Sequence, residues 1–209
     1  MLMSLSSIKS KYKIDITGLI HVGGHIGEEV SDYYSKGIDN IIIFEPLPQS
    51  FVQLESEVAK YQFKKIKLIN KALGSKNKQI EMNVCNQDGL CSSLLNPKHV
   101  LEQYPHIKFP NKQLVDMITM DSIIGENHNY NFLNMDTQGY ELEVLKGSKK
   151  TLKKINFVYT EVNNIEVYEN NALIEDIDKF LEEYDMVRVE TDWMGTTWGD
   201  AFYIKKDLI

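Results

Sequence analysis

Short apolar runs alternate with helical patterns along most of the chain. Residues 18–22 predict a buried strand, and Ile26, Val30 and Tyr33 follow at helical spacing up to Gly37, a residue type that commonly ends a helix. The same order is repeated downstream, which is typical of an α/β fold. The other regularly spaced strands are predicted at residues 41–44, 66–70, 131–135, 155–160, 186–190 and 201–204.

The clearest helical stripe lies near the C-terminus, over residues 172–184, where Leu173, Ile177, Phe180 and Leu181 fall on one face. Two strands follow this helix in immediate succession, which predicts an antiparallel hairpin. We therefore expect a doubly wound, mostly parallel seven-stranded sheet that is closed by an antiparallel C-terminal hairpin.

The domain organisation is simple. No linker rich in Gly, Pro or Ser divides the chain, and 209 residues suit a single domain. We expect an N-terminal extension at residues 1–17 and one domain at 18–209. Between the third and fourth regular strands the pattern loosens, and further strands at 80–85 and 114–120 bracket an inserted loop region of about 86–113. Long irregular insertions of this kind are often lids or binding loops.

Composition and charge limit the classes of function. Hydrophobic residues at 43% and charged residues at 25% are typical of a packed globular protein. The net charge of −7 disfavours nucleic acid as a partner. No apolar run approaches the roughly 20 residues that span a bilayer, and residues 1–13 lack the apolar block of a signal peptide. We therefore expect a cytoplasmic protein with no membrane span.

The cysteines and histidines do not predict a metal site. Cys85 and Cys91 have no second pair with which to complete a tetrahedral zinc site, and we expect two reduced thiols. His99, His106 and His128 occur singly in polar segments without the spacing of metal ligands.

A glycine cluster follows the first predicted strand. Gly23, Gly24 and Gly27 stand where small residues let the backbone approach a ligand and where a following helix offers free N–H groups. The spacing differs from the dinucleotide fingerprint G-x-G-x-x-G, so the cluster alone is also compatible with a plain tight turn.

Glu45 ends the second predicted strand, 22 residues after Gly23. From this position a carboxylate can accept hydrogen bonds from the hydroxyls of a ribose. We therefore expect Glu45 and the glycine cluster to face one crevice and to hold an adenosine. Both NAD and S-adenosylmethionine fit these two features. The antiparallel hairpin at the C-terminus favours a methyltransferase, while an NAD-dependent oxidoreductase and a non-catalytic cofactor-binding module stay open as alternatives.

Several segments together resemble the FkbM family of S-adenosylmethionine-dependent methyltransferases, over roughly residues 18 to 205. The most specific is the Asp-Thr-Gln-Gly-Tyr-Glu-Leu-Glu-Val-Leu-Lys-Gly run that begins at Asp136. The others are the His-Val-Gly-Gly-His-Ile-Gly run from His21, the Phe-Glu-Pro run at 44–46 and the Asn-Lys-Ala-Leu run at 70–73.

The resemblance implies a class I methyltransferase (Rossmann-like) fold, S-adenosylmethionine as cofactor, and methyl transfer to an oxygen of a sugar or another small metabolite. His21 stands where the first motif of the family usually has an acidic residue, so Asp136 or backbone carbonyls would hold the methionine ammonium. Asn134 stands where the family often has Lys. The cofactor contacts implied by the resemblance are His21, Gly23, Gly24, Gly27, Glu45, Pro46, Ala72 and Asp136.

A hydroxyl acceptor must lose its proton, and a base within hydrogen-bonding distance would accelerate the transfer. Glu161, at the end of a predicted strand, is the preferred candidate, followed by Asp136 and His25. A structural carboxylate at Glu161 and a helix cap at Asp136 are the competing interpretations. The acceptor is expected to be a small molecule or a carbohydrate, and the sequence leaves the oligomeric state open. Its candidate contacts are Ser92, Ser93, Asn163, Tyr168, Trp193 and Trp198.

Overall fold

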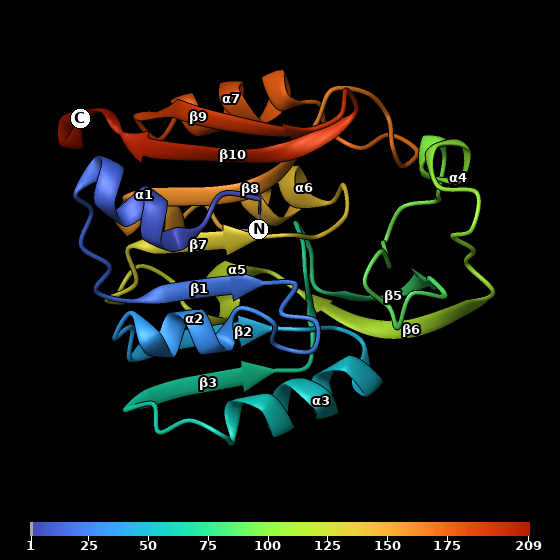
Figure 1. Ribbon diagram of the computed structural model, residues 1–209, viewed down its shortest axis with the longest axis horizontal. Coiled ribbons are helices and arrows are strands. Elements are labelled where there is room, and N and C mark those ends of the chain that lie inside the picture. The colour runs from blue at the N-terminus through green and yellow to red at the C-terminus, as the bar shows by residue number, and fades with distance from the viewer. Residues whose placement is uncertain (1) are drawn as a thin grey trace.

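The computed structural model describes residues 2–209. Seven strands form the main sheet: β1 (Leu19–Val22), β2 (Asn40–Phe44), β3 (Lys65–Ile69), β7 (Phe132–Met135), β8 (Phe157–Asn163), β9 (Met186–Met194) and β10 (Trp198–Lys205). Their order is β3-β2-β1-β7-β8-β10-β9, and β10 runs antiparallel to both of its neighbours. The carboxyl ends of the parallel strands point to the right in Figure 1. The predicted mostly parallel sheet with its C-terminal hairpin is confirmed.

Helices cover both faces of this sheet (Figure 1). One face carries α1 (Leu5–Tyr12), α2 (Val30–Ser35) and α3 (Pro48–Val58). The other carries α5 (Met120–Ile123), α6 (Glu141–Lys146), the 3-10 helix η1 (Thr151–Lys154) and α7 (Ile174–Glu182). A second 3-10 helix, η2 (Lys206–Leu208), follows β10. No helix of residues 2–209 is long and apolar enough to cross a membrane.

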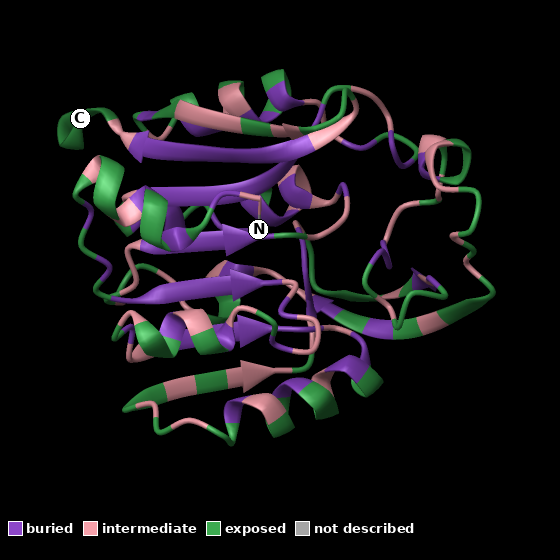
Figure 2. Cartoon of the chain, in the orientation of Figure 1, coloured by how far each residue is buried: buried purple, intermediate pink, exposed green. Residues whose placement is uncertain are grey.

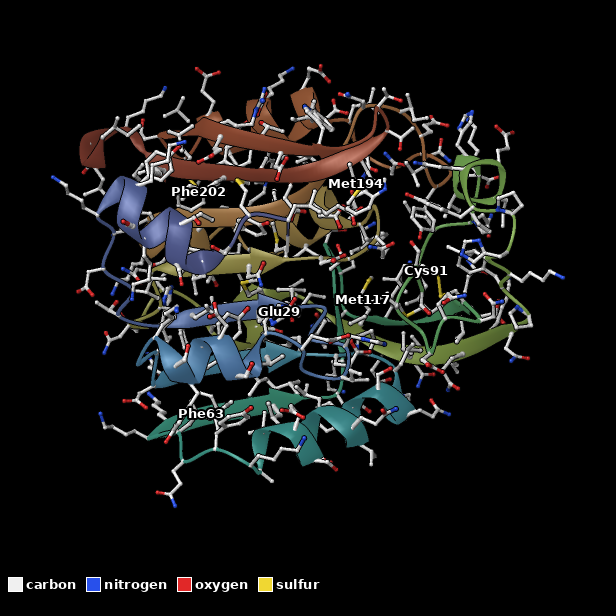
Figure 3. All side chains as sticks on the ribbon, viewed as in Figure 1. Glu29, Phe63, Cys91, Met117, Met194 and Phe202 are labelled. Atoms are coloured by element: carbon white, nitrogen blue, oxygen red, sulfur yellow. A yellow bond between two sulfur atoms is a disulfide. The ribbon has the colours of Figure 1, made fainter. Side chains whose placement is uncertain are left out.

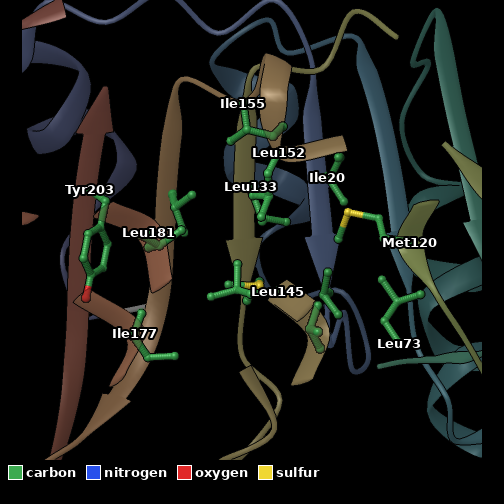
Figure 4. Close-up of a cluster of buried hydrophobic side chains, with 14 of the residues drawn as sticks. Ile20, Leu73, Met120, Leu133, Leu145, Leu152, Ile155, Ile177, Leu181 and Tyr203 are labelled. Atoms are coloured by element: carbon green, nitrogen blue, oxygen red, sulfur yellow. The ribbon is translucent and has the colours of Figure 1, made fainter. Parts of the chain in front are cut away.

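The core consists of two apolar layers, one on each face of the sheet. All residues of β1 and β7 are buried (Figure 2), as expected of parallel strands with helices on both sides. Alternate residues of each strand enter opposite layers: Ile20 and Leu133 pack against Leu145 and Leu152 (Figure 4), whereas Leu19 packs in the layer beneath α1 and α2. Because side chains alternate along a strand, the side chain of His21, two residues after Leu19, also faces the α2 side.

The segment before β1 packs in the layer beneath α1 and α2. Met3, Leu5, Ile8, Ile14 and Ile16 are all buried there. Ser4 caps the N-terminus of α1, because its hydroxyl oxygen accepts a hydrogen bond from the Ser7 N–H at 3.1 Å. The apolar side of α1 therefore covers the sheet as the other helices do.

The helix after β1 starts later than its apolar spacing predicts. α2 begins at Val30, whereas the prediction began it at Ile26. Gly23, His25 and Gly27 all have positive φ angles, of 86°, 42° and 91°, and such angles are incompatible with a right-handed helix. Residues 23–29 form a turn instead, which brings backbone groups to the end of β1.

A second sheet stands beyond the carboxyl ends of the main sheet (Figure 1). It contains β4 (Ala72–Leu73), β5 (Lys78–Val84) and β6 (Asn111–Ile118) in the order β4-β6-β5, and α4 (His99–Gln103) lies in the loop between β5 and β6. The predicted strands at 80–85 and 114–120 are thus present, but they belong to this separate sheet. Together these elements form a wall beside the ends of β1 and β2.

The expectation of two reduced thiols is wrong for this structure. Cys85 and Cys91 form a disulfide in the wall, six residues apart in sequence, and Cys91 lies beyond the strand ends in Figure 3. The bond closes a tight loop that contains Asp88 and Gly89, both of which have positive φ angles. No sequence spacing distinguishes such a local pair from two free thiols, because the two cysteines meet only once the turn has formed.

Replacing both cysteines by Ser is expected to lower the free energy of unfolding by about 2 kcal/mol, since the unfolded chain is no longer cross-linked. Urea titration with and without dithiothreitol measures this. Dithiothreitol should bring the unaltered protein to the stability of the double variant and leave the variant unchanged. A protein whose unfolding is insensitive to the reductant would contradict the expectation.

Candidate functional site

A cavity of about 310 Å³ opens at the carboxyl ends of β1, β2 and β7. Here the chain connections run in opposite directions on either side of β1, toward β2 and toward β7, which is the usual position of a ligand in a doubly wound sheet. The wall formed by the second sheet closes one side. Apolar residues of this wall and of the strand ends that line the cavity are Phe44, Ala72, Leu73, Met82, Leu90 and Leu94.

The glycine turn lies against the ends of two strands. The N–H groups of Gly23 and Gly24 donate to the carbonyl oxygen of Phe44 at 2.9 and 3.0 Å. A Cβ on Gly23 would stand 1.9 Å from the carbonyl oxygen of Asp136, and its φ of +86° disfavours any side chain. Gly23 is therefore required for the close approach of the turn to the end of β7.

Replacing Gly23 by Ala is expected to destabilise the protein by about 3 kcal/mol, because the backbone strain and the collision with Asp136 add. Replacing Gly37 by Ala is the matched control. Its φ is also positive, at +69°, but nothing lies within 4 Å of the added Cβ, so only the strain of about 1 kcal/mol should remain. Chemical denaturation of both variants measures the difference, and equal losses would contradict the collision.

Glu45 is buried at the edge of the cavity, with 5% of its surface exposed. Its Oε2 accepts a hydrogen bond from the His25 N–H at 2.9 Å, and its Oε1 accepts one from the Leu47 N–H at 2.8 Å. Burial raises the pKa of Glu45 to about 7, although these two N–H groups act in the opposite direction. Gly23 and Glu45 line the same cavity, as their spacing in the sequence predicts.

His25 does not act as a free base in this structure. Its Nδ1 lies 2.8 Å from Oε1 of Glu28, and its Nε2 lies 3.0 Å from the carbonyl oxygen of Asp88. Burial lowers the pKa of His25, but these two acceptors outweigh it and raise the pKa to about 9. The side chain is therefore an imidazolium that ties the glycine turn to the wall, because both ring nitrogens donate.

Asp136 is the carboxylate that faces the cavity from the end of β7. The walls of the cavity enclose the Asp136 side chain, but the side chain is exposed to solvent because it points into the open space of the cavity. This enclosure, together with the negative charges of Asp200 and Glu29, raises the pKa of Asp136, while a hydrogen bond from Gln138 lowers it. Asp136 does not cap α6. Instead, Oε1 of Glu141 accepts the N–H of Thr137 at 2.8 Å and holds that turn.

Gln138 connects Asp136 with Glu161. Its Nε2 donates to Oδ1 of Asp136 and to Oε2 of Glu161, at 2.7 Å each, and its Oε1 lies 2.9 Å from the Tyr168 hydroxyl. The φ of Gln138 is +53°, an uncommon angle for a residue with a side chain. The hydrogen bonds on both ends of the amide hold this conformation. Gln138 belongs to the segment that carries the family resemblance, and its part in the site was not predicted.

Glu161 lies behind Gln138 and does not line the cavity. It is buried, with 6% exposed. Burial and the neighbouring charges of Asp136, Glu141 and Asp200 raise its pKa well above the ordinary value. The raised pKa favours the protonated form of Glu161, and Gln138 separates this residue from the cavity. The strand also continues to Asn163, beyond its predicted end at Thr160.

A polar lobe extends the cavity on the α2 side of the sheet, and we define it as His21, Asn134, Tyr159 and Asp200. His21, Asn134 and Tyr159 occupy one row across β1, β7 and β8. The Tyr159 hydroxyl donates to Oδ2 of Asp200, which also accepts the N–H of Leu2 at 2.6 Å. Tyr159 and Asp200 were not predicted as site residues, because Tyr159 lies within a predicted strand and Asp200 directly precedes the one predicted at 201–204.

The remaining predicted residues divide between the cavity and its surroundings. Pro46, Ala72 and Ser92 line the cavity. Gly24 and Gly27 do not line the cavity but let the turn pack closely on the core. A Cβ on Gly24 would stand 2.2 Å from Ile43, and one on Gly27 would meet Leu54.

Five predicted acceptor contacts lie away from the cavity of residues 2–209. Ser93 donates to the Gln138 carbonyl oxygen at 2.7 Å, Asn163 lies beside Glu161, and Tyr168 is buried behind Gln138. Trp193 packs on the apolar layer of α7, and Nε1 of Trp198 donates to the Tyr104 hydroxyl at 3.1 Å. Aromatic residues at the hairpin here cover the core. Among residues 2–209, no three His, Cys, Asp or Glu side chains are grouped so as to hold a metal ion.

Comparisons with known proteins agree with this architecture. The 2-O-methyltransferase NoeI of Sinorhizobium fredii is 27% identical over 155 residues, which cover 70% of this chain and 63% of that protein. A putative tRNA (m1A22) methyltransferase of Streptococcus pneumoniae superposes with a TM-score of 0.55 at 12% identity, covering 97% of this chain and 71% of that one. Magnesium protoporphyrin IX methyltransferase of Synechocystis, solved with bound S-adenosylmethionine, gives 0.52 at 8% identity, covering 96% and 77%.

The two solved structures confirm the predicted class I methyltransferase fold. The chain spans less than two thirds of the length of NoeI. Residues 21–187, most of the chain, match the methyltransferase FkbM domain, and the resemblance noted in the sequence is confirmed. The chain belongs to the FkbM methyltransferase domain family.

Proposed function

We propose that this protein is an S-adenosylmethionine-dependent methyltransferase that methylates an oxygen of a sugar or another small metabolite. One observation carries the proposal: a single cavity at the ends of β1, β2 and β7 presents the Gly23 turn, the Glu45 carboxylate and the Asp136 carboxylate together. Family membership supports methyl transfer, and the curated relative named as a 2-O-methyltransferase supports an oxygen acceptor.

The residues that line the cavity fit S-adenosylmethionine. Glu45 would accept hydrogen bonds from the ribose hydroxyls, and the apolar wall at Ala72, Leu73 and Met82 would cover the adenine. The cavity volume of about 310 Å³ falls in the usual range for small-molecule sites. Because β1 lies between β2 and β7, a ligand whose ribose is held at Glu45 extends over the end of β1 toward Asp136.

When bound, S-adenosylmethionine supplies an activated methyl group on a sulfonium. The protein contributes alignment, which alone can lower the barrier by several kcal/mol. Asp136 is the carboxylate in the cavity that can take the proton of an acceptor hydroxyl, and its raised pKa makes it a stronger base. Asp200 adds a second acceptor for hydroxyl groups of a sugar or similar molecule.

Calorimetric titration with S-adenosylhomocysteine and with NAD⁺ tests the choice of cofactor. We expect saturable binding of the former and none of the latter, and the reverse result would make the protein a nicotinamide enzyme. A screen of sugars and small hydroxylated metabolites with methyl-labelled S-adenosylmethionine then tests transfer. Cofactor binding without transfer to any acceptor would favour a non-catalytic module.

A further inference from the structure

The polar lobe contains a histidine whose tautomer can be assigned from its hydrogen-bond partners. His21 and Asn134 are paired across β1 and β7, and both side chains face α2. Nδ2 of Asn134 donates to the Tyr33 hydroxyl oxygen at 2.7 Å, and that hydroxyl lies 3.3 Å from Nδ1 of His21. Among residues 2–209, Nδ1 of His21 is the acceptor within reach of the Tyr33 hydroxyl proton, so we assign the proton to this hydrogen bond. Neutral imidazole has one N–H, so Nε2 carries the proton.

His21 is held neutral and faces the cavity. The side chain is 3% exposed and lines the cavity. Burial lowers the pKa of His21 to about 4, so the ring is uncharged at neutral pH. Within residues 2–209, no acceptor lies within hydrogen-bonding distance of Nε2. Because His21 lines the cavity, a ligand in the cavity is placed to accept this N–H.

Resting on the function proposed above, we infer that His21, through Nε2–H, binds the carboxylate of the methionine part of S-adenosylmethionine, and that Tyr33 and Asn134 position it for this contact. With the ribose at Glu45, the amino-acid end of the ligand lies over β1 and β7, where His21 stands. A neutral donor suits this place, because it binds the carboxylate without repelling the ammonium and sulfonium. Asp136, on the next strand end, faces the same region and attracts the ammonium.

Three ligands separate this contact from the rest of the cofactor site. S-adenosylhomocysteine has the carboxylate and the ammonium, its decarboxylated analogue keeps the ammonium alone, and 5′-methylthioadenosine has neither. We expect the unaltered protein to bind S-adenosylhomocysteine about 10- to 100-fold more tightly than the decarboxylated analogue, the usual range for a hydrogen bond to a charged group. Calorimetry on the full chain measures both affinities.

In His21→Ala this preference should fall to less than about threefold, while binding of 5′-methylthioadenosine stays within about twofold. His21→Gln, which offers an amide N–H near the position of Nε2, should restore part of the preference. His128→Ala is the matched control, because His128 is a half-buried histidine outside the cavity, and its preference should equal that of the unaltered protein. A full preference in His21→Ala would overturn the inference.

If His21→Ala does not fold, two other measurements test the contact between Nε2 of His21 and the carboxylate. Long-range ¹H–¹⁵N spectra of histidine-labelled protein should show His21 protonated at Nε2, and a proton at Nδ1 would overturn the inference. Tyr33→Phe removes the hydroxyl but keeps the buried ring, and it should reduce the preference about threefold because either tautomer becomes accessible. If the unaltered protein binds 5′-methylthioadenosine but not S-adenosylhomocysteine, the carboxylate contact fails. If it binds neither, the proposed function itself fails.

Discussion

Replacement of Asp136 by Asn is expected to slow methyl transfer at least about 100-fold, the usual contribution of a positioned general base. Asn keeps the shape of the side chain but cannot take the proton of the acceptor hydroxyl. Single-turnover rates with saturating labelled S-adenosylmethionine measure the loss. The affinity for S-adenosylhomocysteine should fall by less than the rate, because only the attraction of Asp136 for the ammonium is lost while Glu45 and the glycine turn stay in place.

Glu161→Gln provides the comparison that separates the two candidate bases. The raised pKa of Glu161 favours its protonated form, and Gln138 shields it from the cavity. An amide therefore resembles its native state, and the rate should fall by less than about tenfold, well below the loss for Asp136→Asn. A larger loss in Glu161→Gln than in Asp136→Asn would return the role of base to Glu161, as the sequence first suggested.

Replacement of Glu45 by Gln is expected to weaken binding of S-adenosylhomocysteine about 10- to 100-fold. The amide loses the charge that strengthens hydrogen bonds from the ribose, and its NH₂ group meets the N–H of His25 or Leu47. Calorimetry measures the affinity. Glu55→Gln, on the exposed side of α3, should leave it unchanged, and equal affinities in the two variants would rule out Glu45 as the ribose contact.

The same carboxylate should make binding depend on pH. The ionised form binds the ribose, and a pKa of about 7 in the free protein means that this form increases about tenfold in population between pH 6 and pH 8. The affinity should rise accordingly in the unaltered protein and stay flat in Glu45→Gln. The stability of the folded protein follows the opposite trend. Because the pKa of Glu45 is raised, the contribution of Glu45 to the free energy of unfolding is largest at low pH and is lost as the pH rises through about 7.

The layers of the fold could be predicted because each regular strand is a short apolar run and each long helix has a spaced apolar stripe. The strands at 41–44 and 131–135 and the helix around Ile177 lie within a few residues of their predicted positions. The start of α2 was misplaced because apolar spacing carries no information on φ angles. Gly23, His25 and Gly27 prevent a helix there, and only the glycines were a visible signal.

The candidate site was predicted in part, for a physical reason. Gly23, Glu45 and Asp136 each directly follow a parallel strand, so the topology alone brings them to one edge of the sheet. The position of Glu161 outside the cavity was not predicted, because it depends on how Gln138 lies between the two carboxylates. Asp200 stands on an antiparallel strand and enters the site through its register with Glu161, which no spacing along the chain reveals.

The wall of the cavity belongs to a detour of the chain that leaves the main sheet after Ile69 at its edge and returns at Phe132 beside β1. Both points of attachment lie in strands whose pairing does not involve the detour. The segment between β5 and β6 nevertheless supports the site, because the Asp88 carbonyl oxygen accepts from His25 and Ser93 donates to the carbonyl oxygen of Gln138. A redesign of the detour that keeps Asp88 and Ser93 would change the lining at Met82, Leu90 and Leu94, while the strand ends that carry Glu45 and Asp136 stay in place.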